Sequence, residues 1–137
     1  MPALPLPVEV DAFLRQPNPA VVASLRRDGS PHTAATWYLW DGERALLNMD
    51  ESRLRLRFMR RDPRVALTAL GDDEWYRHAS LLGRVDELVE DEGLHDIDRL
   101  ARHYTGSAFS NRRASRFSAW VKPEFWHAWE GAHPWPR

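Results

Sequence analysis

The sequence of 137 residues contains no cysteine, so disulfide bridges, thiolate metal sites and a thiol nucleophile are all excluded. It also lacks any run of about 18 apolar residues, and no membrane-spanning helix is predicted. The first residues, MPALPLPVEV, have neither the charged flank nor the long apolar core of a signal peptide. We therefore expect a cytoplasmic protein that does not enter membranes.

Excess charge of one sign is lacking too, because the formal net charge is only −1. A protein that binds nucleic acid through bulk charge carries a clear positive excess, so no nucleic-acid partner is expected. Lysine is nearly absent: Lys122 is the only one, and arginine supplies the other basic residues. That bias fits both a GC-rich genome and a selection for guanidinium groups that bind anions.

Tryptophan, in contrast, is abundant, with seven residues in this short chain. Turn signals divide the chain into short apolar segments, and two of them, Asp28-Gly29 and Asp41-Gly42, are typical of β-hairpins. They predict an antiparallel meander of three strands at 20–26, 31–40 and 44–49. Further strands are predicted at 64–70, 75–88 and 116–129, and helices at 8–15, 50–61 and 90–104, with an extended arm at 1–7 and a tail at 131–137.

These elements predict a single domain over residues 1–137 of the α+β class, mainly β. About six strands with two or three short helices at the corners favour a small closed antiparallel barrel, because closure removes exposed sheet edges. The tryptophans then either fill its core or line a pocket for a planar ligand.

Six arginines lie between positions 53 and 64, in the predicted helix and just after it. At about 100° per residue, Arg53, Arg57, Arg60 and Arg64 lie on one side of a helix. A solvated stripe explains such a row without any function. Arg55 points the opposite way, toward the face that carries Leu54, Phe58 and Met59, and an inward arginine needs an anionic partner.

Two partners for Arg55 stay open at this point. Ser52 is a plausible N-cap, which places Arg55 in the first helical turn, where free N–H groups and the helix dipole favour a phosphate. Alternatively, Asp50 or Glu51 neutralises Arg55 in a local ion pair.

The order of the segments resembles a known family. The residues that carry the resemblance are DGSPH at 28–32, WYLWDG at 37–42, RRDPRVAL at 60–67, LGRV at 82–85, DRLARHYTG at 98–106, RFSAW at 116–120 and WHAW at 126–129. This ordered set is similar to the pyridoxamine 5'-phosphate oxidase-like split β-barrel superfamily, and in particular to its flavin/deazaflavin oxidoreductase branch.

The resemblance implies a six-stranded antiparallel split β-barrel that forms a homodimer with cofactor sites at the subunit interface. It implies that the strand at 33–38 lies along the cofactor ring, that residues 48 and 49 flank the ribityl chain, and that Arg55, with Arg57 next, binds the phosphate. The expected cofactor-binding set is Thr33, Ala35, Thr36, Trp37, Tyr38, Asn48, Met49, Ser52, Arg53, Arg55 and Arg57.

The cofactor implied is the deazaflavin F420, with FMN as the alternative, since both carry a ribityl phosphate. The expected function is hydride transfer to a small organic substrate, in which the ring carries the chemistry and the protein supplies placement. Tyr38, His32 or water would donate the proton, and no metal is expected. The rivals are a non-catalytic flavin, haem or tetrapyrrole binder, and a nucleic-acid binder that uses the arginine face.

Overall fold

The computed structural model describes residues 3–137, so Met1 and Pro2 of the expected arm lie outside the described residues. Its helices are α1 (Val8–Leu14), α2 (Leu54–Arg61), the short 3₁₀ turn η1 (Glu92–Leu94) and α3 (His95–Thr105). Its strands are β1 (Ala20–Leu25), β2 (Pro31–Thr36), β3 (Leu39–Trp40), β4 (Ala45–Asp50), β5 (Arg64–Leu70), β6 (Arg77–Glu90), β7 (Arg116–Glu130) and β8 (His133–Pro134).

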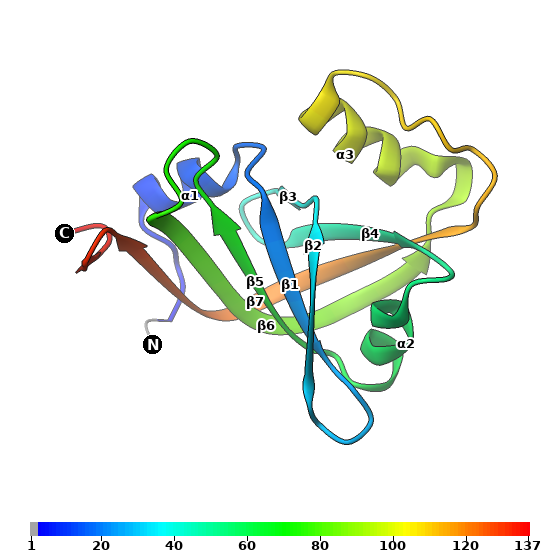
Figure 1. Ribbon diagram of the computed structural model, residues 1–137, viewed down its shortest axis with the longest axis horizontal. Helices are drawn as coiled ribbons and strands as arrows, with labels where there is room; N and C mark the ends of the chain where they lie inside the picture. The colour runs from blue at the N-terminus through cyan, green and yellow to red at the C-terminus, as the bar shows by residue number, and fades with distance from the viewer. Residues whose placement is uncertain (1–2) are drawn as a thin grey trace.

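All eight strands belong to one antiparallel sheet with the order β2-β1-β5-β6-β7-β4-β3, and β8 pairs with β7 (Figure 1). β2 and β3 stand at opposite ends of this order although only two residues separate them in the chain. The sheet must therefore curl round on itself to bring its two ends together. Within residues 3–137 no ladder joins β2 to β4 or β3, so the barrel is split rather than closed.

The core fills the inside of the curled sheet. Alternate residues of each strand point inward, as the period of two requires, and Val22, Leu67 and Leu81 on three neighbouring strands are almost completely buried. Helix α1 packs Phe13 and Leu14 into the same apolar cluster. None of the helices found among residues 3–137 has the length and apolar character needed to cross a membrane.

Both hairpin signals are confirmed, because β1 pairs with β2 around Asp28-Gly29 and β3 pairs with β4 around Asp41-Gly42. The three-stranded meander is wrong, since β2 does not pair with β4. The expected strand at 31–40 breaks at Trp37 and Tyr38, where the chain crosses from one end of the sheet to the other.

Helices α2 and α3 both begin later than the sequence predicts, and the helix expected at 50–61 begins at Leu54. The expected helix at 90–104 begins only at His95, because β6 extends to Glu90 and a tight turn follows, with positive φ at Gly93 (70°) and Leu94 (58°). At Gly83 the register between β6 and β7 shifts, which marks a β-bulge or irregularity. An added Cβ at Gly83 would clash with the carbonyl oxygen of Lys122, so only glycine allows this close approach.

Helices α2 and α3 lie at the end of the sheet opposite the two chain termini, on either side of the split (Figure 1). This arrangement places the first turn of α2, the end of β2 and the inner face of α3 around one shared space.

Candidate functional site

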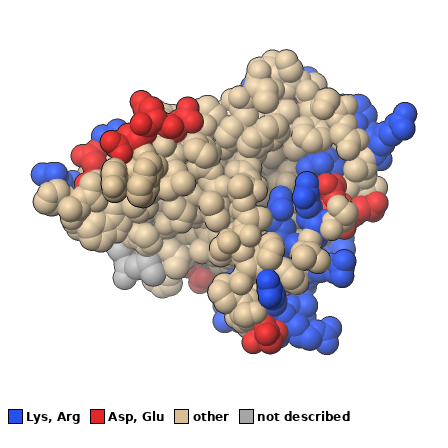
Figure 2. Space-filling model, in the orientation of Figure 1, with Lys and Arg blue, Asp and Glu red and all other residues tan. Residues whose placement is uncertain are grey.

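A cavity of about 630 Å³ occupies this space. The volume lies within the range of small-molecule and cofactor pockets, about 300–1,000 Å³. Figure 2 shows a hollow on this side of the molecule with arginines gathered beside it. Its walls come from the end of β2, from β4, α2, α3 and β7, and from the loop that precedes β7.

Arg55 is the central basic residue of this cavity. It is half-buried in the first turn of α2, and its Nε atom is buried without a hydrogen-bond partner. Burial, together with the positive charge of Arg53, lowers the pKa of the Arg55 guanidinium. Within the described part of the chain no carboxylate lies within ion-pair distance of Arg55, so the local pair with Asp50 or Glu51 is not formed. An anion from outside the chain would complete such a group with charge-assisted hydrogen bonds.

The polar residues next to Arg55 form an ion pair and hydrogen bonds with one another. Asp50 forms an ion pair with Arg53, with 3.4 Å between its Oδ2 and the arginine Nε. Asp50 Oδ1 also accepts hydrogen bonds from the backbone N–H and the hydroxyl of Ser52. These contacts lower the pKa of Asp50, chiefly through the bond from the Ser52 hydroxyl. The predicted N-cap at Ser52 is wrong, because its side chain turns to Asp50 and Arg53 precedes the helix without a side-chain cap.

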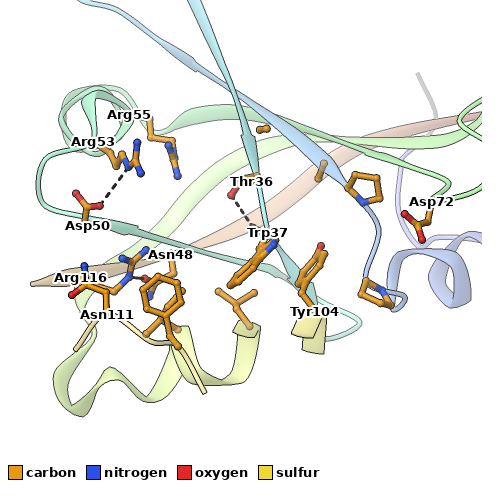
Figure 3. A pocket seen from close by; sticks show the side chains of 17 residues that line it. Thr36, Trp37, Asn48, Asp50, Arg53, Arg55, Asp72, Tyr104, Asn111 and Arg116 are labelled. Atoms are coloured by element: carbon orange, nitrogen blue, oxygen red, sulfur yellow. Dashed lines mark hydrogen bonds and ion pairs between the residues drawn. The ribbon is translucent and has the colours of Figure 1, made fainter. Parts of the chain in front are cut away.

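Arg116, at the start of β7, reaches the cavity from the opposite wall (Figure 3). Its Nε donates a hydrogen bond to Asn48 Oδ1 at 2.7 Å, and its guanidinium lies over the Phe109 ring at 4.7 Å. Asn48 Nδ2 donates to Asp91 Oδ2 at 3.1 Å and to Ser118 Oγ at 3.2 Å. A buried polar network thus holds Arg116 in place, and burial lowers the pKa of its guanidinium.

Aromatic rings form the middle of the cavity. The Trp37 ring stacks on Tyr104, with 5.3 Å between ring centroids and 9° between planes, and it meets the edge of Phe109. Tyr104 Oη donates a hydrogen bond to the carbonyl oxygen of Asn18 at 2.6 Å and accepts one from the backbone N–H of Tyr38. Burial raises the pKa of Tyr104 to about 12, so its hydroxyl stays protonated at neutral pH.

The structure brings together six of the expected cofactor-binding residues. The six that line the cavity are Ala35, Thr36, Trp37, Asn48, Arg53 and Arg55. The other five lie elsewhere: Thr33 and Arg57 are exposed outside it, Tyr38 and Met49 are fully buried in the core, and Ser52 is exposed beside Asp50.

The reasons for these displacements are local. Arg57 is two residues from Arg55, which is about 200° around a helix, so the two side chains cannot share one wall. Met49 follows Asn48 on a strand and therefore points to the other face. Leu54, expected on the inward face with Arg55, is 50% exposed. Arg60, Arg61 and Arg64 are exposed, as a solvated stripe requires.

Neither of the two expected proton donors lies on the cavity wall. Tyr38 is fully buried, and its hydroxyl contacts Asn18 Nδ2 and the carbonyl oxygen of Gln16. His32 lies edge-on against Phe58 on the inner side of β2. Water is the remaining candidate of the three.

Sequence reasoning missed Arg116, Tyr104, Phe109 and Asn111, which all line the cavity. Arg116 lies 61 positions after Arg55 in the chain, and only the pairing of β4 with β7 brings Asn48 opposite Ser118 and Arg116 beside them. The amphipathic pattern of residues 94–104 was visible in the sequence, but it did not indicate that this face covers a cavity. The one sign in the sequence that Arg116 belongs to the site was its place in the motif RFSAW at 116–120.

The cavity therefore has two chemically different parts. Arg53, Arg55 and Arg116 surround one end, and Trp37 and Tyr104 provide flat apolar surface farther along (Figure 3). Such a site suits a ligand that carries an anionic group at one end and a planar ring system at the other.

Comparison with known proteins identifies the family of the chain. The family described as pyridoxamine 5'-phosphate oxidase matches residues 6–130 of the chain. No sequence among the curated proteins matches it.

Several solved structures share the fold. One, named F420 reductase, has a TM-score of 0.80 and 26% identity and covers 88% of this chain and 98% of its own. A conserved hypothetical protein from Mycobacterium tuberculosis has a TM-score of 0.70 and 23% identity, with 93% and 86% covered. An FAD and heme binding protein from Mycobacterium smegmatis has a TM-score of 0.67 and 17% identity, with 94% and 72% covered.

Proposed function

The chain belongs to the pyridoxamine 5'-phosphate oxidase family, and from this premise we propose that it is an oxidoreductase that uses bound F420 to transfer hydride to a small organic substrate. The superfamily is one of flavin-binding oxidoreductases with a split β-barrel. One observation carries the proposal: Arg55 presents a half-buried guanidinium, with an unpartnered Nε, to a cavity whose next wall is aromatic.

The residues of the cavity fit a ribityl phosphate cofactor. Arg55 would bind the phosphate through charge-assisted hydrogen bonds. The edge of β2 that faces away from β1 has no strand partner within residues 3–137, so backbone N–H and C=O groups near Ala35 and Thr36 are free to bond the polar edge of a ring. Trp37 and Tyr104 would exclude water from the ring's surroundings. When bound, the cofactor supplies the hydride chemistry itself.

F420 is preferred over FMN for two reasons. The structural neighbour named F420 reductase shares 26% identity with this chain and superposes with a TM-score of 0.80. In addition, three arginines gather at one end of the cavity, against one carboxylate, Asp50, which is already paired with Arg53. That surplus of positive charge suits the longer anionic tail of F420. FMN remains the second candidate, because it carries the same ribityl phosphate.

A haem or tetrapyrrole binder fits less well. Haem iron takes an axial ligand from histidine, cysteine, methionine or a tyrosinate. Among the described residues, the lining of the cavity includes no histidine, cysteine or methionine, and its tyrosine, Tyr104, has a raised pKa of about 12 and two hydrogen-bond partners. The cavity therefore offers no ready axial ligand.

Titration of the purified protein with F420 and with FMN tests the proposed function. We expect F420 to bind with the lower Kd, and its binding to quench emission from Trp37 at the cavity wall. Riboflavin, which has the ring and ribityl chain of FMN without its phosphate, is the control and should bind more weakly than FMN. Failure of both F420 and FMN to bind at micromolar concentration would overturn the proposal.

The proposal includes a homodimer, in line with the resemblance. On the outer face of the sheet one row of uncharged residues crosses four strands, where Val21, Thr68, Ser80 and His127 lie in register. Large apolar side chains on β7 are also exposed, 47% for Phe125 and 38% for Trp129. An uncharged, partly apolar sheet face of this kind is typical of an interface.

Light scattering on the purified protein checks this expectation. We expect a molar mass twice that of one chain at micromolar concentration, with or without added cofactor. A monomer under both conditions would contradict the homodimer and would leave the cofactor proposal to its own test.

A further inference from the structure

The basic end of the cavity has two walls, and the resemblance points only to the one that carries Arg55. Arg116 lies on the other wall, in a strand that begins 61 residues later in the chain. It is only 9% exposed, yet the part of its side chain that remains accessible faces the cavity.

The contacts of Arg116 leave its terminal amino groups free. Its Nε is bonded to Asn48 Oδ1 at 2.7 Å, and one face of the guanidinium rests on the Phe109 ring. Within residues 3–137 neither Nη atom has a hydrogen-bond or ion-pair partner. The Nη atoms are not fully enclosed, so water reaches them from the cavity, and an anion that replaces this water would form charge-assisted hydrogen bonds with the guanidinium.

Asp91, a carboxylate of this network, makes its own contacts with the start of α3. Asp91 is 6% exposed, and its two oxygens accept hydrogen bonds from the backbone N–H groups of Asp96 and Ile97 at 2.9 Å each. Asp91 Oδ2 also accepts the bond from Asn48 Nδ2. Because its amide is held by Asp91 and Ser118, Asn48 can only present its oxygen to Arg116, and this fixes the direction of the guanidinium.

We propose that Arg116 is a second anion-binding residue of the cavity, that it binds the cofactor's phosphate end from the wall opposite Arg55, and that Asn48 is its positioning residue. This inference rests on the proposed function, since it assumes a cofactor with a phosphate. It differs from that function in assigning a role to β7, which the motif around α2 does not contain.

A purely structural role for Arg116 makes a different prediction. If Arg116 only tied the loop at Phe109 to β4, its loss would weaken binding of every ligand that uses the cavity. If it binds the phosphate, its loss weakens only ligands that carry a phosphate. The ratio of two affinities therefore separates the two roles, whereas stability alone does not.

The experiment compares cofactors with and without phosphate on the full chain. FMN is measured against riboflavin, and F420 against its deazariboflavin fragment, with the wild type, Arg116→Gln and Arg113→Gln. Arg113 is the matched control, because it lies three residues away in the same segment, is exposed and does not line the cavity. We expect Arg116→Gln to reduce the affinity for the phosphate-bearing form about 10- to 100-fold and to leave the phosphate-free form within about 2-fold.

Two further variants complete the test. Arg116→Lys keeps the positive charge but loses the planar guanidinium, which can donate two parallel hydrogen bonds to a phosphate. The preference of this variant for the phosphate-bearing cofactor should therefore fall less than that of Arg116→Gln. Arg116→Lys also provides the comparison if Arg116→Gln does not fold. Asn48→Ala should lower the same preference, and the double variant Asn48→Ala/Arg116→Gln should lower it no further than Arg116→Gln alone, because both changes act through one guanidinium.

The outcomes separate this inference from the proposed function. If the wild type binds the phosphate-bearing cofactor and Arg116→Gln behaves like Arg113→Gln, the inference is overturned and the proposed function stands. Equal losses for the phosphate-bearing and phosphate-free forms would also overturn it, in favour of the structural role. If the wild type binds none of these cofactors, the proposed function fails and this inference fails with it.

Discussion

Replacing Arg55 by alanine is expected to weaken binding of the phosphate-bearing cofactor by about 2–3 kcal/mol, or about 30- to 160-fold. The reason is that Arg55 lines the cavity with a half-buried guanidinium, and its buried Nε has no partner within the described chain. The phosphate would supply charge-assisted hydrogen bonds that water cannot replace fully inside the cavity. Fluorescence titration with F420 and FMN measures the change in Kd.

Arg57→Ala is the matched control for this prediction. Arg57 lies on the same short helix, carries the same charge and is exposed outside the cavity. Its replacement removes one positive charge from the same region, so it measures how much the loss of charge alone weakens cofactor binding. We expect the Kd of this variant to change by less than about 3-fold. Equal effects of the two variants would show that only general charge matters, and Arg55 would lose its assigned role.

Replacing Asp91 by alanine is expected to lower the free energy of unfolding by about 2–4 kcal/mol. Asp91 accepts the backbone N–H groups of Asp96 and Ile97 at the start of α3, as well as the side-chain amide of Asn48. Alanine leaves these donors without their partner at a site that is 6% exposed. Urea unfolding followed by circular dichroism measures the loss.

Glu92→Ala is the control for the Asp91 prediction, because Glu92 is the next residue, is acidic and is exposed. We expect it to change the free energy of unfolding by less than about 0.5 kcal/mol. Asp91→Asn keeps one side-chain oxygen, so its loss in the free energy of unfolding should lie between those of Asp91→Ala and Glu92→Ala. A loss below about 1 kcal/mol for Asp91→Ala would mean that water replaces the carboxylate, and that α3 does not depend on it.

The hydrogen bonds around Asp91 also link α3, which lines the cavity, to Arg116 at the basic end of the cavity. The carboxylate that caps α3 holds Asn48, and Asn48 holds Arg116. Ile97, Leu100 and Tyr104 of the same helix line the cavity. Loss of the cap should therefore weaken cofactor binding as well as stability, and the two effects can be measured on the same variant.

Local signals in the sequence were enough for several elements of the fold. The Asp-Gly pairs specify tight turns by their own backbone preferences, and both hairpins form where they were expected. The break at Trp37 and Tyr38 was not visible, because both residues favour strands and nothing local marks the crossing. Tyr38 lies between β2 and β3, and its side chain is buried in the core, where Asn18 contacts its hydroxyl.

The candidate site was predictable to the extent that it lies within one segment. Helical periodicity alone separated Arg55 from Arg57, and the structure places the first in the cavity and the second outside it. The expected cap at Ser52 was wrong, because Asp50 competes for the same hydroxyl and backbone N–H. The helix begins at Leu54, four residues after the expected start at Asp50, yet Arg55 still lies in its first turn.

The sequence by itself determined the mainly β class, the two hairpins, the inward arginine and the resemblance to a family, because each of these depends on neighbours in the chain or on an ordered set of motifs. Only the tertiary structure decided that the barrel is split, that α3 lines the cavity, and that Arg116 and Tyr104 reach the same cavity as Arg55. The physical reason is that strand pairing and side-chain burial join residues far apart in the chain, such as Asn48 and Ser118. No local preference encodes such a contact, and it exists only once β4 has paired with β7.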